Sequence, residues 1–280
     1  MTGFDWKYDW HMFARKLRGF FDSKERVVWE HYRNSANVEK KSGDELVGEL
    51  DKIMEMDLEV FLTQIQNYPV IGEESSFEKS SKWPPKEKNF WLVDPIDGTH
   101  NFLGENPNFG SIVALIENGE VVFGAIYIFA EHRLGVSGKL YFAGRGLGAR
   151  KFNIHETFSP LAVSVTEEIK DATLLVEGVS KTVVRNRLIK RTWKLTKRFY
   201  KGLSSSVALA KIANGRNATL SADILIMCGN KPWDSLAGAL IVEEAGGIVT
   251  GVDGKPYSLE NCSDLIYTNK FLHPKILALG

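Results

Sequence analysis

Two aspartates lie three residues apart at the end of an apolar segment, where residues 91–102 read WLVDPIDGTHNF. Pro95 stands between Asp94 and Asp97, and its ring fixes φ and removes one backbone donor, so the turn is stiff. Side-chain and carbonyl oxygens can therefore converge on one point. Such an arrangement suits a hard divalent cation, which takes oxygen ligands.

Two more acidic segments accompany this turn. Glu73 and Glu74 follow Gly72 upstream, and Asp234 lies far downstream in the segment KPWDSLAG. Taken singly, an Asp-x-x-Asp turn is usually a solvated loop, paired glutamates are usually surface charge, and an aspartate before an apolar run is usually a helix N-cap. Buried together, carboxylates repel one another unless a cation neutralises them. The combination therefore predicts a metal site.

The composition is typical of a soluble enzyme. The 280 residues include 35 Lys and Arg and 35 Asp and Glu, so the formal charge is zero and indicates no binding to a nucleic acid polymer or an anionic membrane. Cys228 and Cys262 are too few for a disulfide framework, which indicates a reducing compartment. No basic segment followed by an apolar one opens the sequence, so we expect no secretion signal and a cytoplasmic location.

Hydrophobic periodicity predicts alternating helices and strands. Apolar residues recur every three or four positions over 6–20 and 51–65, as on one face of a helix. We expect strands at 70–71, 90–93, 172–176 and 224–227, a hairpin at 111–128, and helices at 204–212 and 234–245. The expected halves are residues 1–150, with most of the metal ligands, and 151–280, with Asp234 and the substrate pocket.

The central turn resembles that of the inositol monophosphatase family, a family of magnesium-dependent, lithium-sensitive phosphatases. It matches the pattern Asp-Pro-Ile/Leu-Asp-Gly-Thr-x-Asn-Phe at every fixed position, with His100 at the variable one. The resemblance covers nearly the whole chain. It implies an α/β fold layered as α-β-α-β-α and assembly as a homodimer.

The resemblance also implies which residues carry the chemistry. The magnesium ligands would be Glu73, Asp94, the backbone carbonyl of Ile96, Asp97 and Asp234. Glu73 and Thr99 would orient a metal-bound water, and Asp51 would accept a hydrogen bond from Thr99.

The physical chemistry of phosphate esters agrees with these roles. A phosphate monoester dianion and hydroxide are both negative, and their uncatalysed reaction is among the slowest known. Two or three Mg²⁺ ions would bridge phosphate oxygens, lower the pKa of a bound water and stabilise the departing alkoxide. Oxygen ligands suit Mg²⁺ better than Zn²⁺. Helices that begin at Gly98-Thr99 and at Ser204-Ser205 could point free N–H groups at the phosphate.

Departures from the family pattern concern the alcohol part of the substrate. Leu203 stands where the family often has glycine, and Met227 stands where the animal inositol enzymes have a glutamate, seven residues before Asp234. Asp223 is an alternative to Met227 for contact with the substrate. The expected substrate-binding residues are Gly98, Thr99, Ser204, Ser205, Met227 and Asp234.

The sequence thus predicts a Mg²⁺-dependent phosphomonoesterase that hydrolyses a small sugar or polyol phosphate, similar to inositol 1-phosphate, with a metal-activated water. Alternatives within the superfamily act on fructose 1,6-bisphosphate, histidinol phosphate or 3′-phosphoadenosine 5′-phosphate. A different class of function, a non-catalytic homologue that binds metal or phosphate as a regulatory subunit, is less favoured. Such a protein has no reason to keep four mutually repelling carboxylates.

Overall fold

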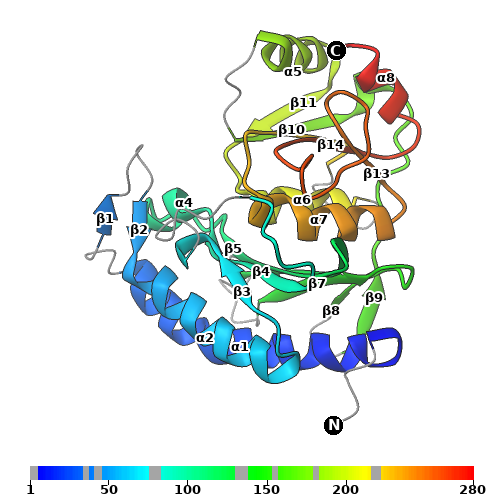
Figure 1. The fold of residues 1–280 in the computed structure, drawn as a ribbon. Helices are drawn as coiled ribbons and strands as arrows, with labels where there is room; N and C mark the ends of the chain where they lie inside the picture. The colour runs from blue at the N-terminus through cyan, green and yellow to red at the C-terminus, as the bar shows by residue number, and fades with distance from the viewer. Residues whose placement is uncertain are drawn as a thin grey trace.

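The chain folds into five layers, in which helices alternate with two β-sheets (Figure 1). The structure is a computed structural model, and it describes residues 6–33, 38–40, 46–75, 83–129, 138–152, 157–178, 183–215 and 222–280. The layers confirm the α-β-α-β-α architecture that the sequence predicts.

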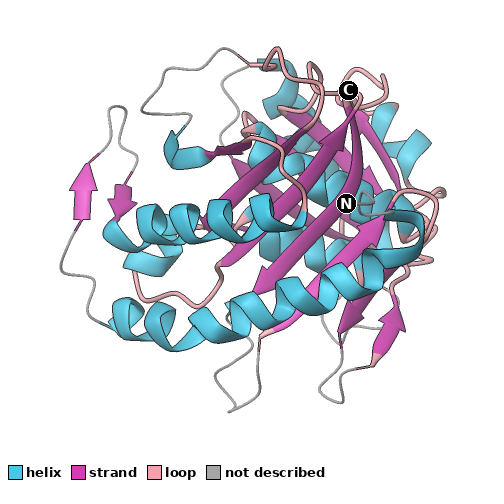
Figure 2. Cartoon of the chain, turned by 60° about the horizontal axis from the view of Figure 1, so that its bottom comes forward, coloured by secondary structure: helices cyan, strands magenta, loops and turns pink. Residues whose placement is uncertain are grey.

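The first layer consists of two long helices, α1 (Trp6–Arg33) and α2 (Glu49–Ile65), which lie across one face of the first sheet (Figure 2). Phe13, Leu17 and Phe21 of α1 are fully buried at the spacing of one helical face. Leu58 and Leu62 repeat this pattern in α2. Both helices confirm the predicted periodicity, and α2 begins two residues before the expected start.

The first sheet has seven strands in the order β3-β4-β5-β6-β7-β8-β9. All neighbours are antiparallel except β3 and β4. The strands are β3 (Val70–Gly72), β4 (Phe90–Asp97), β5 (Gly110–Glu117), β6 (Glu120–Ile128), β7 (Lys139–Gly144), β8 (Ala149–Phe152) and β9 (Phe158–Pro160). A separate hairpin pairs β1 (Val38–Lys40) with β2 (Leu46–Gly48), and the short helix α4 (Thr99–Leu103) follows β4.

The middle layer is formed by α6 (Ser205–Ala213) and α7 (Pro232–Glu244), which pack between the two sheets (Figure 1). The second sheet has the order β11-β10-β12-β14-β13. Its strands are β10 (Thr173–Gly178), β11 (Arg198–Lys201), β12 (Ile224–Cys228), β13 (Ile248–Gly251) and β14 (Asp264–Thr268). Its other face carries α5 (Val183–Leu195), α8 (His273–Leu277) and the 3₁₀ turn η2 (Ile169–Asp171).

The two sheets are consecutive in the chain, and the crossing from the first to the second lies between Pro160 and Thr173. The division near residue 150 stays a prediction. Cys228 and Cys262 are both buried as free thiols. None of the described helices combines the length and apolarity needed to cross a membrane.

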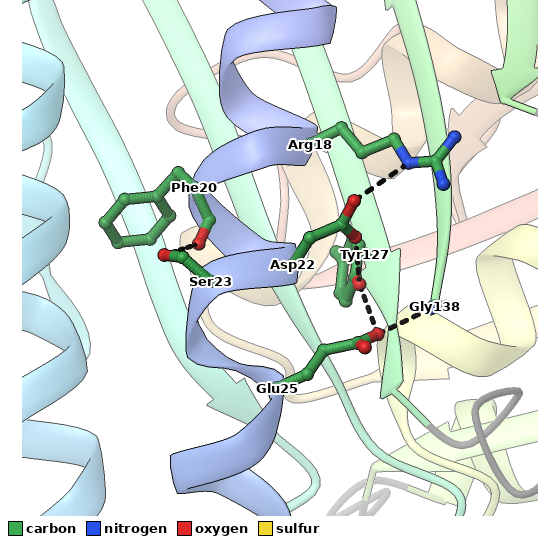
Figure 3. Close-up of polar contacts among 7 residues, drawn as sticks. All are labelled: Arg18, Phe20, Asp22, Ser23, Glu25, Tyr127 and Gly138. Atoms are coloured by element: carbon green, nitrogen blue, oxygen red, sulfur yellow. Dashed lines mark hydrogen bonds and ion pairs between the residues drawn. The ribbon is translucent and has the colours of Figure 1, made fainter. Parts of the chain in front are cut away.

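A buried polar contact fastens α1 to the first sheet (Figure 3). The Tyr127 hydroxyl on β6 lies 2.8 Å from Asp22 Oδ1 and 2.5 Å from Glu25 Oε1, and Glu25 also accepts the Gly138 amide at 2.5 Å. Burial and the two carboxylates raise the pKa of Tyr127 far above its usual range. The hydroxyl therefore keeps its proton and remains a donor to the helix.

Candidate active site

A β-bulge brings the two aspartates of the central turn to the same side of the first sheet. Residues three apart on a regular strand point to opposite faces. Here Asp94 pairs with Ile112 and Asp97 pairs with Gly110, so three steps on β4 oppose two on β5. The extra residue reverses the alternation, and the Ser111 hydroxyl holds the bulge by donating to the Pro95 carbonyl. Pro95 thus occupies a position where no ladder donor is needed.

Three carboxylates meet at this point. One oxygen from each of Asp94, Asp97 and Asp234 lies within 4.8 Å of the other two. Burial, reinforced by the charge of Glu73, raises the pKa of Asp94 well above its usual range, and burial together with Asp97 does the same for Asp234. Asp94 Oδ1 is buried without a hydrogen-bond partner. A cluster of hard, anionic oxygens with one unused buried acceptor has the chemistry of a divalent-cation site.

Glu73 lies outside this group of three, but close enough for its charge to raise the pKa of both Asp94 and Asp234. Glu55 of α2, which the sequence analysis missed, positions the segment that carries it. The Glu55 carboxylate accepts the amides of Glu74 at 2.9 Å and Ser75 at 2.8 Å. Gly72 is required beside it, because a Cβ there would lie 2.1 Å from the Glu55 carboxyl group.

Asp234 has two roles at once. It is in the first turn of α7, where its Oδ2 accepts the Lys231 amide at 2.8 Å. Its carboxylate also joins the acidic cluster. The N-cap of α7 is Lys231 and not Asp234, which lies at the third helical position and bonds back to the cap, and the role of Asp234 as a metal ligand stays a prediction.

Asp97 is held by the start of α6. The amides of Ser205 and Ser206 donate to its carboxylate at 3.3 and 2.5 Å, and these bonds oppose the rise in the pKa of Asp97 that burial causes. The sequence analysis expects the amides at this helix start to point at phosphate. In the structure they donate to the carboxylate of Asp97. Gly98 has φ +91°, and a Cβ there would lie 2.8 Å from Ser204 Cβ, so the close approach of α4 and α6 requires glycine.

The position that favours glycine at this helix start is Ser204 and not Leu203. Ser204 has φ +100°, a conformation that residues with a Cβ rarely adopt. Its Oγ accepts the Val207 amide at 3.4 Å and lies 3.0 Å from Ser206 Oγ. The glycine-like conformation at this helix start therefore belongs to Ser204, one residue after the position that the sequence analysis compares with the family's glycine.

Thr99 and Asp51 both lie beside the cluster. The Thr99 hydroxyl donates to the Ile96 carbonyl at 3.1 Å, the same carbonyl that is expected to bind metal. Asp51 of α2 is buried, and its charge contributes to the raised pKa of Asp94. The roles of Thr99, Asp51 and Glu73 in orienting a water remain predictions.

Met227 is wrongly placed in the substrate pocket by the sequence analysis. It has no exposed surface and packs within the core between the second sheet and α6 and α7. Asp223 does not replace it, because it lies at the other end of β12, where it accepts the Thr173 amide at 2.7 Å. The apolar run of β12 gives no sign of which side chains a neighbouring layer covers.

A different carboxylate, Glu177, lies in register with Met227 on the neighbouring strand β10. Glu177 is buried, and its Oε1 accepts the Leu203 amide at 2.9 Å. Burial raises the pKa of Glu177 to about 7, and the charge of Asp97 contributes. The sequence analysis missed this residue. The available signal was an acidic residue that ends an apolar strand before a glycine, as in the central turn.

Comparison with known proteins identifies the chain. The profile described as the inositol monophosphatase family matches residues 24–279. The chain belongs to this family. Similar relatives are the fructose-1,6-bisphosphatase/inositol-1-monophosphatase of Thermotoga maritima (30% identical, covering 88% of this chain and 87% of the relative) and human inositol monophosphatase 1 (31%, 89% and 87%). As a member of this family, the chain is a phosphoric monoester hydrolase.

Solved structures of the family share the fold. The inositol monophosphatase of Thermotoga maritima is 26% identical and has a TM-score of 0.73, covering 96% of this chain and 94% of its own. An inositol monophosphatase and NADP phosphatase complexed with Mg²⁺ and phosphate has a TM-score of 0.77 at 20% identity, with the same coverage. The second likeness concerns the fold alone.

Proposed function

We propose that this phosphatase is Mg²⁺-dependent and hydrolyses a small sugar or polyol phosphate similar to inositol 1-phosphate. The observation that carries the proposal is the cluster of Asp94, Asp97 and Asp234, whose oxygens lie within 4.8 Å of one another. Their raised pKa values and the unpartnered oxygen of Asp94 describe a site whose charges are unbalanced without a cation.

Each residue at the site has a proposed role in binding metal or water. Asp94, Asp97, Asp234, Glu73 and the Ile96 carbonyl would hold two or three ions. Mg²⁺ bound there would stabilise charge on the phosphate and the departing alkoxide and lower the pKa of a water. Thr99 would hold that water by its hydroxyl, and Asp51 would orient Thr99.

Fructose 1,6-bisphosphate is a second candidate substrate. Relatives from Thermotoga maritima and Aquifex aeolicus, each 30% identical, are named fructose-1,6-bisphosphatase/inositol-1-monophosphatase. Both candidates present a phosphate monoester on a polyhydroxylated carbon chain or ring, which the same metal site would bind. The non-catalytic alternative finds a parallel in a Neisseria meningitidis relative named putative Nus factor SuhB. The complete set of carboxylates favours turnover in this chain.

A phosphate-release screen tests the proposal. The panel contains inositol 1-phosphate, fructose 1,6-bisphosphate, histidinol phosphate, 3′-phosphoadenosine 5′-phosphate and glycerol 2-phosphate, each with Mg²⁺ and with a chelator. We expect turnover only with Mg²⁺, and the highest kcat/KM for a sugar or polyol ester. Turnover that persists in chelator would contradict the metal assignment, and a complete lack of turnover across the panel would favour the regulatory alternative.

Three further expectations of the sequence analysis accompany this proposal. A homodimer would appear as twice the chain mass in light scattering. Lithium would lower the steady-state rate by occupying one magnesium position. A cytoplasmic location would appear as soluble tagged protein in that compartment. Each stays a prediction until it is measured.

A further inference from the structure

Positive charge is concentrated in one segment of this neutral chain. No aspartate or glutamate occurs between Glu177 and Asp223, whereas 11 of the 35 lysines and arginines fall in these 45 residues. The zero net charge, from which the sequence analysis excluded nucleic acid, therefore conceals a strongly cationic region. Local charge governs association with a polyanion more than the net charge does.

Most of these cations lie on α5 and β11. Four of them recur at steps of three, one and three along α5, which places them on one exposed face of the helix. The opposite face packs on the second sheet through Leu188 and Thr192, which are buried. Three more follow in and beside β11. In chain order the seven are Arg187, Lys190, Arg191, Lys194, Lys197, Arg198 and Lys201.

These seven side chains have no carboxylate partner among the residues that the structure describes. Arg191 donates to the Leu279 carbonyl at 2.8 Å, whereas Arg185, just before the stripe, forms an ion pair with Asp264. All seven are exposed. Figure 1 shows α5 and β11 at the outer side of the second sheet, next to the C-terminus. The cations thus face solvent and remain available to an anionic partner.

Aromatic rings lie among the cations. Trp193 is 52% exposed and Tyr200 is 46% exposed. The Trp193 ring packs against Phe199 with 5.3 Å between centroids, which fixes its orientation. Tyr200, the next residue on β11, points to the other face of this edge strand, so the two rings flank the edge of the sheet. Exposed rings interspersed with cations are the combination that binds single-stranded nucleic acid, because phosphates contact the cations and bases stack on the rings.

Two other partners fit this surface less well. β11 is an edge strand, but pairing it antiparallel with a second copy would place cations opposite cations. A bilayer would require a free apolar helix face, and the apolar face of α5 is already packed on the sheet. A flexible polyanion with bases offers phosphates to the cations and bases that can stack on the rings.

We propose that α5 and β11 form a binding surface for single-stranded nucleic acid. Lys190 and Lys194 contact successive phosphates, and Trp193 and Tyr200 stack on bases. Binding is independent of sequence, since no feature of the surface reads base edges, and it weakens steeply with salt as counterions are released.

Fluorescence anisotropy of the full chain tests the proposal. The probes are 20-nucleotide RNA and DNA strands of mixed sequence, blocked at both ends and used in chelator so that the phosphatase site is not engaged. We expect binding to both, with log K against log salt falling at a slope of about −3 for four neutralised phosphates. Lack of binding at low salt, or a slope near zero, would overturn the proposal.

A matched pair of variants locates the surface. Lys190→Glu/Lys194→Glu should weaken binding at least tenfold, whereas Lys86→Glu/Lys88→Glu changes the same number of exposed lysines and should leave it unchanged. Both variants should retain phosphatase activity, which shows that they fold. Equal losses in the two variants would mean that net charge alone is responsible, and would also overturn the proposal.

The rings distinguish a nucleic acid from other anions. Trp193→Ala and Tyr200→Ala should each weaken binding by about five- to a hundredfold, and Trp193 fluorescence should be quenched on binding. Inorganic polyphosphate should bind more weakly than RNA and be insensitive to Trp193→Ala. Equally tight binding to phosphatidylserine vesicles, with the same loss in Trp193→Ala, would assign the surface to a membrane instead.

Discussion

At the scale of single residues, the acidic cluster lowers the folding stability of the metal-free protein. Asp94 and Asp97 are buried carboxylates whose ionised forms are disfavoured unless a cation is bound. Removing one charge should therefore stabilise the metal-free protein, whereas it would remove a ligand from the metal-bound enzyme.

The first prediction follows from this opposition. Asp94→Asn should abolish nearly all Mg²⁺-dependent activity and should raise the Tm of the protein in chelator at pH 7.5. Added Mg²⁺ should raise the Tm of the unmodified protein and not that of the variant. The exposed Asp171→Asn serves as the control and should change neither quantity. Full turnover in Asp94→Asn would refute the metal assignment.

The second prediction concerns Glu177, whose pKa burial raises to about 7 from 4.5. Because the folded state holds the proton more tightly than the unfolded chain, the contribution of Glu177 to stability is fully present below pH 4.5, is lost as pH rises to about 7 and does not change above it. The full difference is at most about 3 kcal/mol. Glu177→Gln keeps an oxygen for the Leu203 amide and removes this dependence. Urea unfolding in chelator should show the variant gaining over the unmodified protein only as pH rises through that window.

At the scale of elements, the start of α6 carries backbone strain. Ser204 at φ +100° costs on the order of 1–3 kcal/mol relative to glycine in the same conformation, while loss of its cap costs only a few tenths. The third prediction is that Ser204→Gly raises the free energy of unfolding by about 1 kcal/mol and Ser204→Ala lowers it. Ser205→Gly, at an ordinary helical position, should destabilise. A destabilising Ser204→Gly would show that the strain is absent.

The contact between α1 and β6 gives the fourth prediction. Tyr127→Phe removes the hydroxyl that lies between Asp22 and Glu25, so the free energy of unfolding should fall by about 1–3 kcal/mol. Tyr68→Phe, which removes a partly exposed hydrogen bond to Glu117, should cost less than about 1 kcal/mol. Chemical denaturation of both variants makes the comparison, and equal losses would contradict the role of burial.

Helices and strands with a clear hydrophobic pattern could be predicted from the sequence. Features that depend on packing against neighbouring elements could not. The two N-terminal helices bury regular apolar stripes, and the hairpin of β5 and β6 is an apolar run that is buried almost throughout. Among the α5 side chains that the structure describes, only Leu188 and Thr192 are buried, so the apolar period of this helix is weak and the sequence analysis missed it. The positive φ of Ser204 leaves no mark in the sequence because the residue is not glycine.

At the scale of the whole molecule, the acidic cluster joins the first sheet to the middle helix layer. Asp94 and Asp97 come from the first sheet, whereas Asp234 comes from the helix layer shared by both sheets. The sequence predicts these ligands because their local motifs are short and distinctive. It does not predict Glu55 or Glu177, because their roles depend on amides that are far away in the chain.

The uneven distribution of charge also affects how the protein behaves in purification. The isoelectric point of 7.0 suggests that neither type of ion-exchange resin should retain it at pH 7. However, residues 178–222 carry no carboxylate, so the remaining 235 residues carry all 35 carboxylates and only 24 of the cations. The molecule therefore has a large electric dipole moment and can dock with its cationic face toward a sulfonate matrix. We expect retention on a cation exchanger at pH 7 and earlier elution of Lys190→Glu/Lys194→Glu than of Lys86→Glu/Lys88→Glu, although both variants have the same net charge.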